Sequence, residues 1–137
     1  MKAARHTLCL LSLVALLALP HAALSQASPD FELGESNGYR VRIYSQLSPV
    51  QINRIHSWEL EVLDADDNPV EGATITVTGG MPDHDHGMPT NPQVTGALAN
   101  GRYLLEGVRF HMPGRWVLLI DIDGPDTESS LELEFTL

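Results

Sequence analysis

The feature that most constrains the fold of this chain is an alternation of apolar and polar residues with a period of two, which begins at Tyr39. Residues 39–44 read Tyr-Arg-Val-Arg-Ile-Tyr. Within residues 55–63, Trp58, Leu60 and Val62 lie on one face, and Glu59 and Glu61 lie on the other. An alternation of this kind is typical of a β-strand with one buried face, whereas an amphipathic helix repeats every 3.6 residues. The pattern therefore predicts a β-domain.

Turn-forming residues divide the rest of the chain into short segments of the same kind. Gly, Pro, Asn and Asp separate the segments, and Asn100-Gly101 is a strong hairpin signal. We expect strands over residues 39–46, 55–63, 73–78, 94–98, 102–110, 116–122 and 130–137. About seven short strands with frequent turns predict an all-β fold, an immunoglobulin-like antiparallel β-sandwich, with a barrel as the alternative. Trp58 and Trp116 are expected in its core.

The N-terminus has the order of a secretory signal peptide. Lys2 and Arg5 precede an apolar run of 12 residues from Leu8 to Leu19, and small residues lead up to Ser28. The run is shorter than the roughly 20 residues that span a bilayer, although a retained membrane anchor is the alternative. We predict a signal peptide over 1–27, a flexible leader over 28–37 and one β-sandwich domain over 38–137. The mature protein is expected to be periplasmic or secreted, without stable membrane insertion.

The composition of residues 28–137 excludes several functional classes. They contain no Cys and no Lys, and they set six arginines against 18 acidic residues. A disulfide or a thiolate metal site is therefore excluded, and a nucleic-acid partner is not expected because phosphates would be repelled. An acidic surface favours metal cations or basic partners.

The residues that could carry chemistry are concentrated in two short segments. One segment runs from Met81 to Pro92, and the other is the pair His111-Met112. If each connection reverses the chain direction, strand order places both segments and His56 at the same end of the sandwich. Imidazole and thioether ligands suit copper, and thioether selects Cu(I); zinc would leave the methionines unexplained. The predicted metal ligands are His84, His86, His111, Met81, Met88, Met112 and His56.

Structural roles are the alternative for several of these residues. Met81 and Met88 could anchor the loop on the sandwich. His111 could cap a strand end, and His56 could be a partly buried histidine that bonds within the core.

The order of these motifs resembles the YtkA-like domains, a group close to the FixH-like proteins. The resemblance rests on residues 68–70 and 73–75, the Gly79–Pro92 loop with its histidines and methionines, residues 101–103, and Phe110-His111-Met112-Pro113-Gly114 followed by Trp116. It covers about residues 39–136. It implies a small exported or membrane-anchored β-sandwich, and several relatives are associated with copper or heavy-metal handling or with cytochrome oxidase assembly. Unlike the FixH-like proteins, this chain is expected to have no transmembrane anchor.

Two functions follow as hypotheses. The first is an exported metal-binding protein that binds or delivers copper in the periplasm. The second is a protein-interaction module of the cell envelope that binds no metal and docks on another exported or envelope protein. The chain is not expected to be an enzyme, since it has no nucleophile elbow, no phosphate-binding loop and no cysteine after residue 27.

Overall fold

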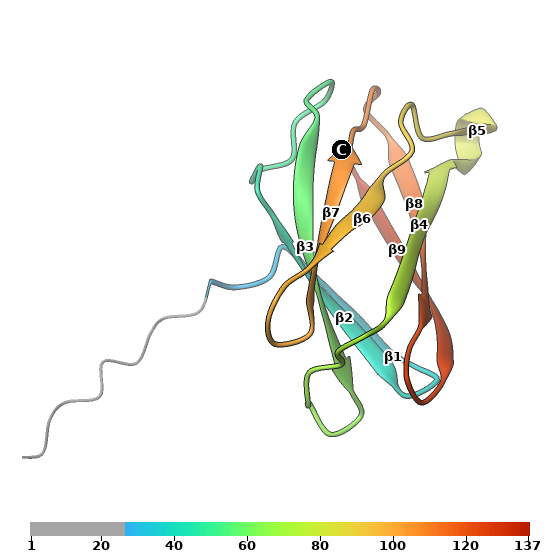
Figure 1. The fold of residues 1–137 in the computed structure, drawn as a ribbon. Helices are drawn as coiled ribbons and strands as arrows, with labels where there is room; N and C mark the ends of the chain where they lie inside the picture. The colour runs from blue at the N-terminus through green and yellow to red at the C-terminus, as the bar shows by residue number, and fades with distance from the viewer. Residues whose placement is uncertain (1–26) are drawn as a thin grey trace, which may run out of the picture.

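The protein is a sandwich of two antiparallel β-sheets (Figure 1) in a computed structural model that describes residues 27–137. The all-β sandwich prediction is confirmed. The predicted signal peptide lies outside the described residues except for Ala27. No helix within residues 27–137 is long and apolar enough to cross a membrane.

The two sheets contain five and four strands. The five-stranded sheet has the order β1 (Phe31–Ser36), β2 (Tyr39–Ser45), β3 (His56–Asp64), β7 (Arg102–Val108), β6 (Gln93–Ala97). The four-stranded sheet has the order β5 (His86–Gly87), β4 (Thr74–Met81), β8 (Arg115–Asp123), β9 (Glu128–Thr136). A single 3₁₀ turn, η1 (Pro82–His84), is the helical element of the described part.

The expectation of a flexible leader over residues 28–37 was wrong. Phe31–Ser36 forms β1, which pairs antiparallel with β2 from Phe31 opposite Ile43 onward. The Phe31 ring lies 5.7 Å from the Trp58 ring, and Leu33 is buried. The strand forms because these two apolar side chains, two residues apart, reach the core. With the two-residue β5, it brings the strand count above the expected seven.

An aromatic cluster fills the core at one end of the sandwich. Trp58 and Trp116 are fully buried, as expected, and Phe110 lies between them at 5.8 Å and 5.0 Å between ring centroids. The burial of large apolar side chains such as these is the main stabilising contribution to a small domain. The cluster forms the floor beneath the connections at this end.

Apart from the two-residue β5, which runs in the same direction as β6, the chain reverses at each connection, so the strand parity argued from the sequence holds. His56, at the start of β3, pairs with Val108 at the end of β7, which places the segment after β7 beside the connection before β3. The connections 46–55, 82–92 and 109–114 all lie at this end (Figure 1). We call it the histidine end. The β3–β4 and β8–β9 connections lie at the opposite end.

Candidate functional site

A tight β4–η1–β5 reversal places His84 and His86 at the histidine end. Asp85 closes the turn in the left-handed region at φ 52°, and its backbone N–H donates to the Pro82 carbonyl. His86–Gly87 then pairs back onto Gly80 and Met81. A Cβ on Gly80 would lie 2.8 Å from the Gly87 Cα, so only glycine permits this close pairing.

An ion pair fastens this reversal to the neighbouring strand. Arg115 on β8 donates from Nη2 and Nε to the two carboxylate oxygens of Asp83, at 2.9 Å and 3.1 Å. Its Nη1 donates to Glu134 on β9 at 3.2 Å. The hydrogen bonds from Arg115 hold the pKa of Asp83 below its ordinary value, and both carboxylates raise the pKa of Arg115. This Asp83–Arg115 ion pair, which we call the anchor, fixes the position of η1 and therefore of the two histidines.

The fold brings three of the four predicted histidines together. The ring centroids of His86 and His111 are 4.9 Å apart, and those of His84 and His86 are 5.9 Å apart. Trp116 lies against the group, 5.6 Å from the His111 ring. These rings come from β5, η1 and the β7–β8 connection, so their proximity is a product of the tertiary structure.

Two of these histidines have a ring nitrogen that is buried without a hydrogen-bond partner. Nδ1 of His86 lies 3.0 Å from the Gly87 carbonyl oxygen. Because a carbonyl can only accept, Nδ1 carries the proton, and Nε2 of the neutral ring is left with a lone pair. That Nε2 is buried without a partner, as is Nδ1 of His111. In metal-binding histidines, a hydrogen bond to one ring nitrogen orients the ring and leaves the other nitrogen free to bind the metal, and His86 has this arrangement.

His56 lies at the same end but deeper in the core. It is 9% exposed, and its ring neighbours are Phe110 at 6.0 Å and Trp58 at 6.1 Å. Its Nδ1 donates to the Arg54 carbonyl at 3.0 Å, while its Nε2 is buried without a partner. The ring is therefore held as part of the aromatic floor.

The three methionines occupy different environments. Met81 is fully buried in the core cluster, and a Cβ on Gly114 would lie 2.8 Å from its Cε. Met88 and Met112 are half-buried and pack on the edge of the core. The Met112 carbonyl accepts a hydrogen bond from the Trp116 indole at 3.1 Å. Two thioethers thus remain near the surface, and the third is a core side chain.

Within residues 27–137, no three His, Cys, Asp or Glu side chains converge closely enough to hold a metal ion. The arrangement offers a pair of imidazoles with a third imidazole beside it, and the same two segments carry the half-buried Met88 and Met112. The sequence did not indicate the Asp83–Arg115 anchor. The acid in the loop and the arginine before Trp116 are ordinary residues for their positions, and only the sheet pairing brings them together.

Comparison with known proteins finds a matching family and a solved structure of similar fold. The model of a family described as YtkA-like matches residues 34–121. No curated protein matches the chain. A crystal structure of a DUF4426 family protein from Pseudomonas aeruginosa aligns with a TM-score of 0.56 and 12% identity, covering 77% of this chain and 94% of that one. At this identity the likeness concerns the fold alone.

Proposed function

The chain belongs to the YtkA-like family, and from that premise we propose that it is an exported protein that binds copper at the histidine end and delivers it in the periplasm. The observation that carries the proposal is the pair of buried, unpartnered nitrogens, Nε2 of His86 and Nδ1 of His111, on adjacent rings. A buried polar atom without a partner is costly, and a metal ion would satisfy both.

The donor types favour copper over harder ions. Two imidazoles and a thioether form a neutral, partly soft ligand set, which suits Cu(I) better than Mg²⁺ or Ca²⁺. Met88 and Met112 are the thioethers available for such a set, because Met81 lies in the core. His84 lies beside His86 and is exposed, so it can complete the ligand set as the ion binds.

The proposed role is binding and transfer rather than catalysis. The ligands lie in connections at the end of the sandwich, where loops on a rigid scaffold commonly bind ligands and partners. The basic, apolar and small-residue order of the first residues supports export. Copper would occupy a site that is accessible from the end of the domain, as transfer requires.

The test is competition for Cu(I) against chromogenic chelators in the presence of a reductant. The wild type is compared with the His86→Ala/His111→Ala double variant, and Asn91→Ala is the control because it changes an exposed residue of the same connection. We expect the double variant to bind more than about 100-fold more weakly, since losing even an outer-shell partner costs 10- to 100-fold. Circular dichroism checks that each variant is folded.

Equal binding by the wild type and the double variant would place copper elsewhere. Failure of the wild type to compete at all would remove the metal proposal. Native mass spectrometry of protein purified from the periplasm provides the independent readout, because it reports the ion that the protein carries.

A further inference from the structure

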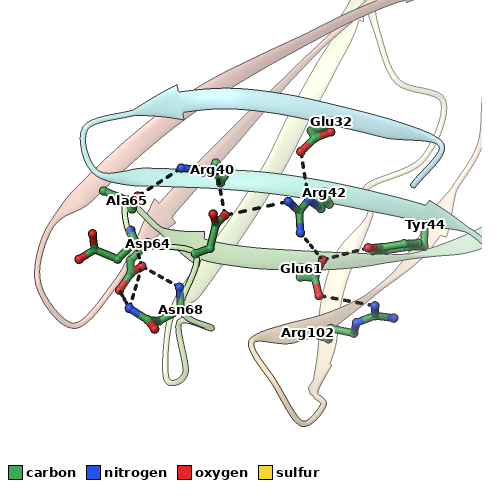
Figure 2. Close-up of polar contacts among 11 residues, drawn as sticks. Glu32, Arg40, Arg42, Tyr44, Glu61, Asp64, Ala65, Asn68 and Arg102 are labelled. Atoms are coloured by element: carbon green, nitrogen blue, oxygen red, sulfur yellow. Dashed lines mark hydrogen bonds and ion pairs between the residues drawn. The ribbon is translucent and has the colours of Figure 1, made fainter. Parts of the chain in front are cut away.

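The arginines of this acidic domain fall into two groups. Arg40, Arg42, Arg102 and Arg115 all form ion pairs with acidic side chains. Figure 2 shows three of them in a charged network on the five-stranded sheet, where Glu61 lies between Arg42 and Arg102. Arg54 and Arg109 have no ion pair among residues 27–137. In a domain with 18 acidic residues, two arginines without a counter-charge call for an explanation.

Both unpaired arginines lie at the histidine end and belong to one surface. Nη2 of Arg109 donates to the Asn53 side chain at 3.0 Å. The backbone N–H of Asn53 donates to the Phe110 carbonyl at 2.7 Å, which ties the connection 46–55 to the segment after β7. Arg54 follows Asn53 directly and is exposed. The two guanidinium groups are therefore carried by two segments that the fold holds together.

Exposed apolar side chains flank these arginines. Ile55 is 66% exposed and Ile52 is 38% exposed, and both belong to the same connection as Arg54. Single exposed apolar residues are ordinary. Two isoleucines beside two unpaired arginines form a surface that combines apolar and positively charged groups. We call Ile52, Arg54, Ile55 and Arg109 the arginine patch. Arginine is enriched in protein interfaces, and the fully buried core of an interface is more apolar than the rest of the protein surface.

Acidic residues are absent from the segments that form the patch. Residues 46–58 and 107–112 contain no Asp or Glu. Glu106, three residues before Arg109, accepts a hydrogen bond from the Thr95 hydroxyl. Both oxygens of Asp30 are engaged as well, by the Ser45 backbone N–H and the Ser48 hydroxyl. The opposite end of the sandwich is rich in carboxylates: Asp64, Asp66, Asp67, Glu71, Asp123 and Asp126. The two carboxylates of the histidine end, Asp83 and Asp85, belong to the β4–η1–β5 reversal, so the segments that carry the patch have none.

We propose that the arginine patch is the docking surface for a protein partner that presents carboxylates beside apolar side chains. The charge distribution orients this partner, because the acidic end repels it while Arg54 and Arg109 attract it. The isoleucines supply the apolar burial that makes the encounter specific. Phe110 joins the patch to His111, so the partner lies beside the candidate metal ligands. That last consequence rests on the proposed function, whereas docking itself does not.

The experiment maps binding on metal-free protein, in a chelator, by the shifts of backbone amide resonances. The probe is a short peptide that alternates glutamate with leucine, and its counterpart has lysine in place of every glutamate. The test variant is Arg54→Gln/Arg109→Gln. The matched control is Arg40→Gln/Arg102→Gln, which changes the net charge equally but lies on the outer face of the five-stranded sheet.

We expect the glutamate peptide to shift amides in residues 52–56 and 109–111 and to bind more weakly as salt is added. The test variant should bind about tenfold more weakly, and the control should bind like the wild type. Equal weakening in both variants would reduce the effect to net charge and overturn the proposal. Binding of the lysine peptide at this surface, or shifts elsewhere with the glutamate peptide, would also overturn it. Because no metal is present, none of these results depends on whether copper binds.

Discussion

The imidazole rings of His86 and His111 lie with their centroids 4.9 Å apart, although one belongs to β5 and the other to the connection between β7 and β8. The β4–η1–β5 reversal and the connection after β7 bring them together. The Gly87 carbonyl fixes the tautomer of His86, and the Trp116 ring packs beside both histidines. A pair already in place loses little conformational entropy on binding, which favours affinity.

The first prediction separates thioether ligands from core methionines. Met88→Leu and Met112→Leu should weaken Cu(I) much more than Cu(II), because thioether is a soft ligand and leucine keeps most of the volume. Met81→Leu is the control, since the same chemical change is made in a fully buried side chain. It should leave Cu(I) affinity unchanged and cost less than about 1.5 kcal/mol of stability.

Chelator competition for both oxidation states measures these affinities. If Met81→Leu weakens Cu(I) as much as the other two substitutions, the loss comes from the fold and not from a ligand. If none of the three changes Cu(I) binding, the site consists of imidazoles alone.

The second prediction concerns the β3–β4 connection at the opposite end. The Tyr103 hydroxyl is buried, donates to the Val70 carbonyl at 2.7 Å and accepts from the Ala73 backbone N–H at 2.9 Å. Tyr103→Phe leaves both backbone groups without a partner, so it should lower the free energy of unfolding by about 1–3 kcal/mol. Tyr44→Phe removes a hydroxyl bonded to Glu61 on the outer face and should cost less than about 1 kcal/mol. Urea melts that rank the two in the reverse order would contradict this.

The third prediction tests the turn that carries His111 and Met112. Gly114 has φ 128°, and a Cβ there would lie 2.8 Å from Cε of the buried Met81. Gly114→Val adds backbone strain to overpacking and should destabilise the domain by about 2–4 kcal/mol. Glu132→Gln, at an exposed position of β9, should change stability by less than about 0.5 kcal/mol. Thermal melts measure both effects. Equal melting midpoints for the two variants would refute a strained, closely packed turn at Gly114.

Local patterns in the sequence were sufficient for most of the sandwich. The strands expected over 94–98 and 102–110 are β6 (Gln93–Ala97) and β7 (Arg102–Val108). Asn100 and Gly101 both have positive φ, at 62° and 66°, as the Asn-Gly hairpin signal requires. Alternation and turn chemistry act over a few residues, so they can be recognised without tertiary information.

Features that depend on contacts between distant segments were not predictable. The contact between Phe31 and Trp58 is one such feature, because the two residues are far apart in the chain. The strand β1 itself was a missed local signal, since Asn37-Gly38 joins it to β2 as an Asn-Gly hairpin in which both residues have positive φ. β4, expected to end at residue 78, continues to Met81 because Gly79 and Gly80 pair with β8. That extension places Met81 in the core. For the histidines, strand parity predicted the shared end but could not predict which rings touch.

The last prediction uses the ion pair that anchors η1. The bond from Arg115 lowers the pKa of Asp83, so the folded state holds this carboxylate charged at pH values where the unfolded chain begins to protonate it. Its stabilising contribution is therefore complete above the unfolded pKa of about 4 and is lost as pH falls through the folded value. Asp83→Asn should melt below the wild type near neutral pH, and the difference should shrink below about pH 4.

Asp85→Asn is the control for this substitution. It changes the same chemistry two residues away, and asparagine tolerates the left-handed conformation that Asp85 adopts at φ 52°. Asp85 has no ion pair within residues 27–137, so its variant should melt like the wild type at every pH. A difference for Asp83→Asn that persists unchanged to about pH 3, or an equal effect of Asp85→Asn, would contradict the anchor. Because η1 leads directly into β5, loosening it should also displace His86 from His111, which amide shifts of residues 84–88 would report at neutral pH.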